Sequence, residues 1–206
     1  MAERKPGAPA PQPDTTVADA DWSGRDLAAQ AYTKVAFVDV DLTESRSDGA
    51  VFTECTFRRA QFNVSVHANA AFVNCTFVGC AFFDARFTDC KLVGSTFERC
   101  TFDSLQVVGG NWSFVALPRA DLRTASLIGV RMREADLRGA RCQGATLRDV
   151  DLSGAALDGA QLSRCDLRGS DLSALDPRQV ELRGAVVTYE QALALAAALG
   201  LDIRAE

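Results

Sequence analysis

Seven cysteines and one histidine are the residues of this 206-residue chain that could bind a metal or act as nucleophiles. No two cysteines form a CxxC pair, and a single histidine cannot complete the usual Cys–His zinc sites. No Ser or Cys has a candidate base partner, and no glycine-rich phosphate loop is present. We therefore expect no metal site, no cofactor and no catalytic residue.

The spacing of the apolar residues indicates a structural repeat of five. From Trp22 to Val187, a Leu, a Phe or another mostly apolar residue occupies nearly every position whose number ends in 2 or 7. An α-helix cannot place every fifth residue on one face, because five steps of about 100° change the direction by about 140°. A strand with a period of two also fails. A chain that turns a corner after each unit points every central residue inward, and four sides make a coil of about 20 residues.

The positions beside each central residue follow the same repeat. Two residues before it stands a small side chain, which fits beside a large one in a close-packed interior. Two residues after it Gly recurs, which suits corners that need positive φ. Cysteines occupy the small inward position six times, at Cys55, Cys75, Cys80, Cys90, Cys100 and Cys165. Cys142 and His67 take central positions, so we predict that all eight side chains pack inside. Parallel Cβ directions make disulfides unexpected.

Several units resemble a known family. Ala135-Asp136-Leu137-Arg138-Gly139 and Val150-Asp151-Leu152-Ser153-Gly154 resemble the A(D/N)LxG signature of pentapeptide repeat proteins. The resemblance implies an all-β fold, a right-handed quadrilateral β-helix, in most of the chain. Such a rod is expected to be about as wide as a DNA duplex.

Composition predicts three segments. Residues 1–20 are rich in Pro, lack the repeat and lack an apolar h-region, so we expect a disordered tail rather than a signal peptide. Residues 21–187 are expected to form the β-helix, and residues 188–206 a C-terminal helix with a capping or dimerisation role. No hydrophobic run is long enough to span a membrane. With the family resemblance, this predicts a cytoplasmic bacterial protein without membrane contact.

The outward positions are where a binding function is expected. Folded at about 20 residues per coil, the first half aligns Asp41, Glu44, Asp84 and Asp103 on one side, with Asp48 and Asp89 on the adjoining side. This acidic stripe is a candidate partner-binding surface, and a merely solvated charged face is the alternative. Phe83 and Phe114 are apolar at outward positions, so each is a possible anchor for a partner.

The C-terminal segment predicts a helix. Thr188-Tyr189-Glu190-Gln191 has a capping-box pattern, and the residues from Ala192 to Leu199 are apolar almost all round. A helix across the end of a rod can cover only one of its own sides there, so we expect this one to pack against a second copy. The predicted homodimer interface contains Tyr189, Leu193, Leu195, Ala196, Leu199, Leu201 and Ile203. A simple end cap is the alternative.

The closing segment sharpens the family resemblance. Asp171-Leu172 through Asp176-Pro177, then Val187 to Ala192 and Ala197 to Leu201, resemble the same region of MfpA-type fluoroquinolone-resistance proteins. That resemblance implies dimers of end-joined rods that imitate duplex DNA, bind DNA gyrase, and inhibit it or protect it from quinolones. It implies a protein partner and no direct binding of nucleic acid.

Two alternatives to a gyrase-binding function stay open. One is a generic interaction scaffold without a topoisomerase target. The other alternative is a carbohydrate-active enzyme. It is the weaker of the two, because the unbroken repeat has no insertion between coils that could build a cleft.

Overall fold

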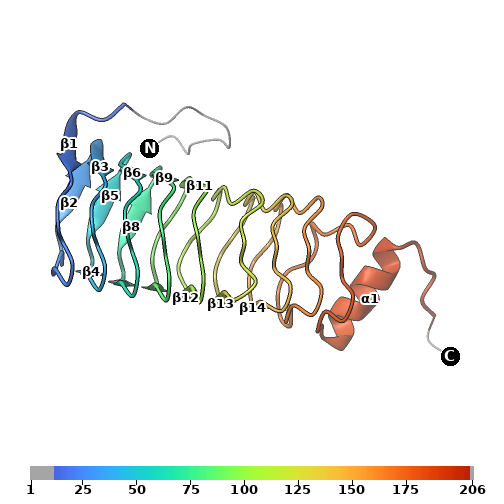
Figure 1. The fold of residues 1–206 in the computed structure, drawn as a ribbon. Coiled ribbons are helices and arrows are strands. Elements are labelled where there is room, and N and C mark those ends of the chain that lie inside the picture. The colour runs from blue at the N-terminus through green and yellow to red at the C-terminus, as the bar shows by residue number, and fades with distance from the viewer. Residues whose placement is uncertain (1–11, 205–206) are drawn as a thin grey trace.

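The computed structural model describes residues 12–204, which form a rod of stacked coils followed by one helix (Figure 1). Each coil bonds to the next in parallel register, with partners 20 residues apart, as in Phe37 with Phe57 and Phe57 with Phe77. The chain is therefore a parallel β-solenoid with four five-residue sides per coil, and the predicted all-β β-helix with a short C-terminal helix is confirmed.

The four sides of the coil stack into four faces. Face 1 is the sheet β1 (Thr15–Ala18), β3 (Val35–Val38), β6 (Thr56–Arg58), β9 (Thr76–Val78) and β11 (Thr96–Glu98). Face 3 is the sheet β4 (Arg46–Asp48), β7 (Val66–Ala68), β10 (Arg86–Thr88), β12 (Gln106–Val108), β13 (Ser126–Ile128) and β14 (Thr146–Arg148). Face 4 is the sheet β2 (Ala31–Thr33), β5 (Val51–Thr53) and β8 (Ala71–Val73).

Face 2 lies opposite face 4 and has no assigned strand. Isolated bridges hold it together, and they link Asp21, Asp41, Gln61, Ala81 and Thr101, then Asp121, Arg141, Gln161 and Glu181. The solenoid begins at Thr15, inside the segment that the composition assigned to a tail, because β1 pairs with β3 in the register of the later coils. The rest of that expected tail, residues 1–11, lies outside the described residues.

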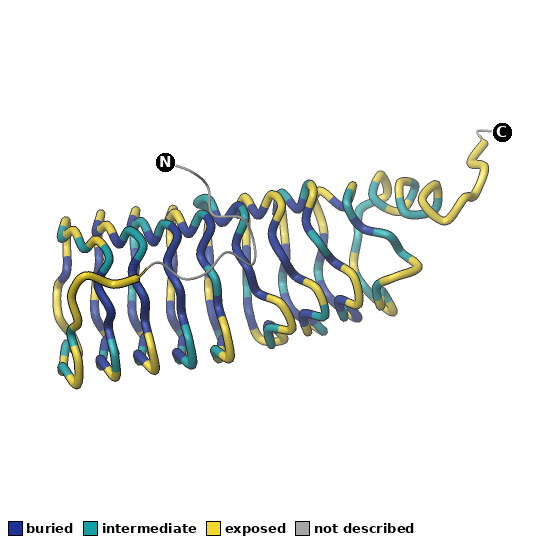
Figure 2. The backbone as a smooth tube through the Cα atoms, turned by 90° about the horizontal axis from the view of Figure 1, so that it is seen from above, coloured by how far each residue is buried: buried dark blue, intermediate teal, exposed yellow. Residues whose placement is uncertain are grey.

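The interior is one continuous apolar column, which Figure 2 shows as a buried line along the rod. On face 1, Phe37, Phe57, Phe77 and Phe97 stack with ring centroids 4.6–4.8 Å apart. Leucines take over at the central positions of the later coils, and Leu122, Leu152 and Leu167 are each at most 1% exposed. The cysteines lie inside as predicted, except that Cys100 is only partly buried. Burial of one large side chain per side of every coil provides most of the stabilisation.

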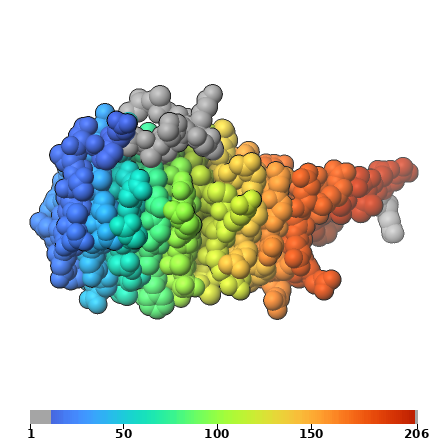
Figure 3. All heavy atoms as spheres, turned by 45° about the horizontal axis from the view of Figure 1, so that its top comes forward, coloured from blue at the N-terminus to red at the C-terminus, as the bar shows by residue number. Residues whose placement is uncertain are grey.

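The C-terminal helix α1 (Tyr189–Ala198) crosses the end of the last coil. Its capping box is formed as predicted, since Thr188 Oγ1 accepts from the Gln191 N–H at 3.3 Å and Gln191 Oε1 accepts from the Thr188 N–H at 2.7 Å. Gln191 Nε2 also donates to the carbonyls of Leu167 and Ser170, both at 2.7 Å, and so fastens the helix to the rod. Figure 3 shows this end narrowing away from the broad body of coils.

His67 is buried inside the rod, as its central position predicts, and its hydrogen bonds define its tautomer. The Ser65 hydroxyl donates to the Phe62 carbonyl, so Ser65 Oγ accepts from Nε2–H of His67 at 2.9 Å. Nδ1 then accepts from the Ser47 hydroxyl at 2.6 Å. Because the ring is fully buried, desolvation lowers the pKa of His67 to about 3. The imidazole is thus a neutral packing group.

The depressed pKa predicts a pH-dependent stability. His67 is the sole histidine of the chain. In the unfolded chain it binds a proton below about pH 6.5, whereas the folded chain does not until about pH 3. The unfolding free energy should therefore fall by about 2 kcal/mol from pH 7 to pH 5 through this residue. Denaturant unfolding of the double variant Ser47→Ala/His67→Phe should show a loss smaller by that amount. Equal losses in both proteins would contradict this role.

Candidate interaction surface

Face 2 carries an uneven charge along the rod. Between Asp21 and Ser104 this face holds five outward carboxylates, Asp21, Asp41, Glu44, Asp84 and Asp103, here called the acidic half of face 2, and its one basic side chain there is Arg25, which lies over the Trp22 ring. These five charges equal the formal net charge of −5 of the whole chain. From Asp121 on, the basic half of face 2 carries Arg123, Arg141, Arg164 and Arg183 against Asp121 and Glu181.

Faces 1 and 4 are balanced by comparison. Face 4 carries the acidic residues Glu54, Glu134, Asp151 and Asp171 and the basic residues Lys34, Lys91, Arg131 and Arg133, so its charges largely cancel. Several of these charges pair directly, as in Arg133 with Asp151 at 2.5 Å and, on face 1, Arg138 with Asp136 at 2.7 Å. Exposed pairs of this kind contribute little to stability, but they remove the net field of a face. Face 2 therefore carries more of the excess negative charge than either of these faces.

The acidic stripe predicted from the sequence divides between two faces. Asp41, Glu44, Asp84 and Asp103 lie on face 2, whereas Asp48 and Asp89 lie on the neighbouring face 3. Among residues 12–204, the ion-pair partner of this set is Arg86, which lies 3.6 Å from Asp84. The stripe therefore stays largely unneutralised.

Some of these carboxylates also serve the fold. Asp41 Oδ1 accepts from the Thr43 N–H at 2.8 Å, which satisfies a donor that the ladder leaves unpaired. Asp48 accepts from the Asn69 amide at 3.2 Å. Glu44 and Asp103 have neither an ion pair nor a side-chain hydrogen bond to the described chain. They are thus the carboxylates of face 2 whose presence the fold explains least.

The basic half is neutralised only in part. Asp121 is shared by Arg123 and Arg141, at 2.8 and 2.7 Å, and the hydrogen bond from Arg123 is the main cause that holds the pKa of Asp121 below its usual range. Arg164 and Arg183 form no ion pair with residues 12–204. Two guanidinium groups therefore stay available at the C-terminal end of this face.

The two aromatic candidates differ in exposure. Phe83 is 54% exposed on face 2, beside Val64, which is 40% exposed. Phe114 is only partly exposed, and it lies on face 4, where it occupies a corner at φ 60°. Phe83 is thus the better anchor, and it sits within the acidic half of face 2.

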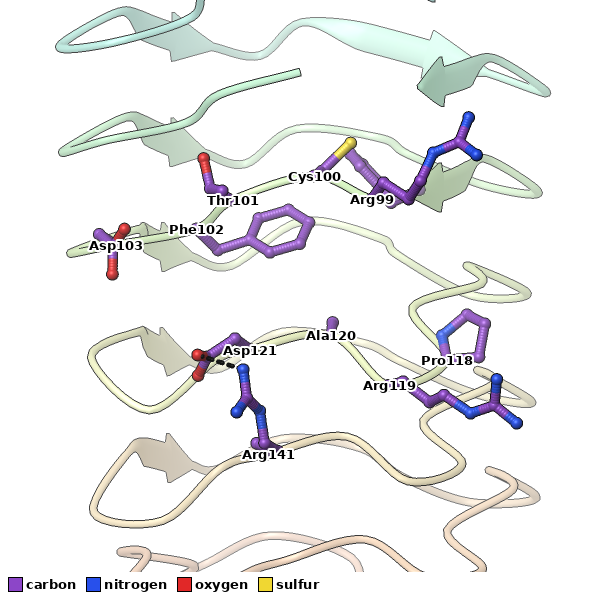
Figure 4. Close-up of a pocket in the computed structure, with 11 residues that line it drawn as sticks. Arg99, Cys100, Thr101, Phe102, Asp103, Pro118, Arg119, Ala120, Asp121 and Arg141 are labelled. Atoms are coloured by element: carbon purple, nitrogen blue, oxygen red, sulfur yellow. Dashed lines mark hydrogen bonds and ion pairs between the residues drawn. The ribbon is translucent and has the colours of Figure 1, made fainter. Parts of the chain in front are cut away.

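The ladder of face 2 opens where the acidic half meets the basic half. The pattern of the other coils predicts bonds from Phe102 N–H to Asp121 O and from Asp121 N–H to Cys100 O, and neither is formed. A cavity of about 250 Å³ lies there, between the coil of Thr101 and Phe102 and the coil of Asp121 (Figure 4). Faces 3 and 4 stay bonded at the same level, as in Gln106 with Ser126 and Asn111 with Arg131.

Two residues account for the opening. Pro118 restricts the backbone of the residue before it, next to the corner that leads into face 2. Thr124 occupies a corner where Ser104 and Gly144, one coil away on either side, have φ of 57° and 76°. Thr124 does not adopt positive φ, and its hydroxyl accepts a hydrogen bond from the Ser104 N–H at 2.9 Å. Sequence reasoning missed this site, although Pro118 was a visible signal.

Metal binding and thiol chemistry are the remaining candidates within the described part of the chain. No group of three His, Cys, Asp or Glu residues within it could hold a metal ion. Burial raises the pKa of the Cys90 thiol to about 11 and that of Cys165 to about 12, so neither is a thiolate nucleophile near neutral pH. The outer surface is therefore the candidate functional site.

The C-terminal helix is a second candidate surface. None of its residues is buried, and Leu195 is the helix residue that packs against the core. Leu193 and Ala196 are partly exposed. Four further apolar side chains of the predicted interface are exposed: Tyr189 at 75%, Leu199 at 51%, Leu201 at 61% and Ile203 at 47%. No helix among the described residues has the length and apolar character needed to cross a bilayer.

Two family models match different parts of the rod. The family model for pentapeptide repeats matches residues 117–154, 135–174 and 147–186, the part with Leu at the centres. This part of the chain consists of pentapeptide repeats. The Phe-rich part, residues 17–102, matches the family model for the SV2A/B/C luminal domain.

One curated relative of the chain is the pentapeptide repeat protein MfpA of Mycolicibacterium smegmatis. The two are 39% identical over 64 residues, which are 31% of this chain and 28% of MfpA. The matched segment thus spans little more than a quarter of that relative.

Solved structures agree on the fold. A trypsin-treated form of QnrB1, a plasmid-mediated fluoroquinolone resistance protein, has a TM-score of 0.74 at 20% identity, over 94% of this chain and 99% of the other. HetL, involved in heterocyst differentiation regulation in the cyanobacterium Nostoc, has a TM-score of 0.62 at 21% identity, over 85% and 84%.

The open ladder predicts a local difference in hydrogen exchange. The Phe82 N–H donates to Thr101 O at 2.9 Å, and the Arg141 N–H to Ala120 O at 2.8 Å. The N–H groups of Phe102 and Asp121 lack these bonds, so we expect them to exchange at least about tenfold faster than those of Phe82 and Arg141. NMR-detected exchange of the full chain measures all four. Equal protection would mean that the ladder is closed in solution.

Proposed function

We propose that this protein is a non-enzymatic DNA mimic that binds DNA gyrase through the acidic half of face 2. It would inhibit the enzyme, protect it from quinolones or other gyrase poisons, or do both. The observation that carries the proposal is the segregation of charge, because the excess carboxylates gather on one face while faces 1 and 4 are balanced. The closing segment resembles that of MfpA-type proteins, and this resemblance is the reason for proposing DNA gyrase as the partner.

The linear charge density supports the comparison with DNA. Five carboxylates are spread over five successive coils, with two on the second coil and none on the third, and because each coil rises by about 4.8 Å the acidic half carries on average about one negative charge per 5 Å. One DNA strand carries one phosphate per about 3.4 Å. The acidic half is therefore a rigid band of anions whose average density is near that of one strand. A basic DNA-binding surface would attract it from a distance, and salt would weaken the attraction.

The C-terminal helix supplies the second part of the proposal, a homodimer through Tyr189, Leu193, Leu195, Ala196, Leu199, Leu201 and Ile203. Exposed apolar side chains on and after α1 would be covered by the same segment of a second copy around a two-fold axis. Such a dimer joins the rods at their C-terminal ends. The acidic halves then lie at the two outer ends of the particle, far from the joint (Figure 1).

The first experiment titrates purified bacterial DNA gyrase with this protein and measures supercoiling at two salt concentrations, with and without a quinolone. The double variant Glu44→Lys/Asp103→Lys should inhibit, or protect, at least about tenfold less well, because it places cations in the row without removing a hydrogen bond of the fold. The matched control is Glu54→Lys/Glu134→Lys on face 4, which has the same change in net charge and should act as the parent protein does.

Two results would contradict the proposal. Equal losses in both double variants would show that net charge, not face 2, matters. No effect of the folded, dimeric parent on several gyrases would favour the generic scaffold. In that case Phe83, the exposed aromatic of face 2, would be the anchor, and binding to its partner would be insensitive to salt and lost in Phe83→Ala.

The dimer has its own test. Leu199→Asp/Leu201→Asp places two charges in the exposed apolar segment and should shift the protein from dimer to monomer in sedimentation equilibrium, with unchanged circular dichroism. Asp202→Ala, between the same positions in the sequence, should stay dimeric. A parent protein that is monomeric at micromolar concentration would contradict the proposed interface.

A further inference from the structure

A recurring two-donor clamp holds a carboxylate or amide oxygen in several coils. In three of them, a Ser donates both its backbone N–H and its hydroxyl to one side-chain oxygen of the residue two positions earlier. The distances are 2.9 and 2.6 Å for Ser23 with Asp21, 3.1 and 2.7 Å for Ser113 with Asn111, and 3.2 and 2.7 Å for Ser153 with Asp151. The clamp binds an oxygen because it offers two convergent donors.

Ser163 has the same position in its coil but lacks this acceptor. Gln161 stands two residues earlier, and its side-chain oxygen accepts from Nε2 of Gln143 instead. Ser163 is 8% exposed, and its hydroxyl has no hydrogen-bond partner among the described residues. Its backbone N–H also has no acceptor there. A buried hydroxyl without a partner is unfavourable, so an acceptor from outside the chain would be stabilised here.

The surroundings of Ser163 favour a negatively charged acceptor. A recess of about 650 Å³ lies beside it, lined by Gln143, Ser163, Arg164, Glu181, Arg183 and Gly184. Arg164 and Arg183 form no ion pair with the described chain, so two guanidinium groups border the unfilled clamp. Gly184 has no side chain to occupy the space. This recess lies in the basic half of face 2, at the far end from the acidic half.

The remaining two polar groups select among anions. The side-chain oxygen of Gln143 is buried without a partner, and it can only accept a hydrogen bond. Glu181 adds a negative charge to the lining. A ligand that presents one carboxylate with an N–H donor nearby can satisfy Ser163, the two guanidinium groups and Gln143, whereas Glu181 repels a phosphate dianion more strongly because the dianion carries twice the charge.

We propose that this recess binds the side-chain carboxylate of an Asp or Glu in a partner protein. The carboxylate takes the place that Asp151 takes at Ser153, between the two donors of Ser163, and the guanidinium groups of Arg164 and Arg183 neutralise it. A backbone N–H of the same partner segment donates to Gln143. Face 2 then makes two unlike contacts, acidic at one end and basic at the other, so a partner can bind the rod in one direction only.

The test uses the ¹⁵N-labelled full chain, titrated with the peptide acetyl-Gly-Asp-Gly-amide and, separately, with inorganic phosphate. The peptide should shift the Ser163 amide resonance in a saturable way and leave that of Ser153, whose clamp is filled, unchanged. Arg183→Ala should weaken the peptide at least about fivefold. Arg168→Ala on face 3, where Arg168 pairs with Asp166 at 2.7 Å, is the matched control and should have no effect.

A second variant keeps the proposal falsifiable without removing a charge from the recess lining. Gln161→Asp recreates the arrangement of Asp151 and Ser153 and supplies the carboxylate from within the chain, so it should abolish peptide binding while the rod stays folded. Unchanged binding by Gln161→Asp would overturn the proposal, as would the absence of a Ser163 shift. Phosphate binding as strong as peptide binding would replace the carboxylate site by an unselective anion site. No gyrase is present, so failure here is separate from failure of the proposed function.

Discussion

The narrow interior of the rod is the constraint on which the rest of the structure depends. It admits one large side chain from each side of a coil, and that side chain must lie directly above its equivalent, as Phe57 does between Phe37 and Phe77. This packing holds consecutive coils in register, because a slip would place polar side chains inside. Every outward residue is therefore aligned with the residue 20 positions later. Outward residues that are 20 positions apart in the sequence thus form columns along the surface of the rod.

Most carboxylates in those columns serve the fold. Asp21, Asp41 and Asp121 accept from a backbone N–H two residues later, a donor that the parallel ladder does not use. Asp84 and Asp89 stand at corners of positive φ, which Asp tolerates better than most residues. Acidic composition alone is thus weak evidence of DNA mimicry. The stronger signal is where arginine is scarce, and that is the first half of face 2, where Arg25 is the one basic side chain.

The period of five made the solenoid, the inward position of His67 and the capping box at Thr188 predictable. These features depend on local spacing and on the register that the large apolar central residues maintain. The alignment of Asp41, Glu44, Asp84 and Asp103 was predictable for the same reason. The pairing of Arg133 with Asp151 was not, because it depends on which rotamers reach across coils. The start of the solenoid at Thr15 was also missed, since the first strand carries no strong central residue.

The open ladder beside Pro118 and the unfilled clamp at Ser163 are departures from a repeat that is otherwise followed closely. The first arises at Pro118 and Thr124. The second arises where Gln161 stands two residues before Ser163, in place of the Asp or Asn that stands two residues before Ser23, Ser113 and Ser153. In a repeat protein, such exceptions are where a surface can differ from a plain scaffold. Both departures lie on face 2, the face that also carries the excess negative charge.

Hydroxyl-radical footprinting of the protein alone and in complex with DNA gyrase tests the central claim most directly, because two aromatic side chains report on opposite faces. Phe83 lies in the acidic half of face 2, and Phe114 lies on face 4. The account predicts that gyrase protects Phe83 from oxidation and leaves Phe114 as reactive as in the free protein. Protection of Phe114 with Phe83 unchanged would show that the partner contacts the other side of the rod, and would contradict it.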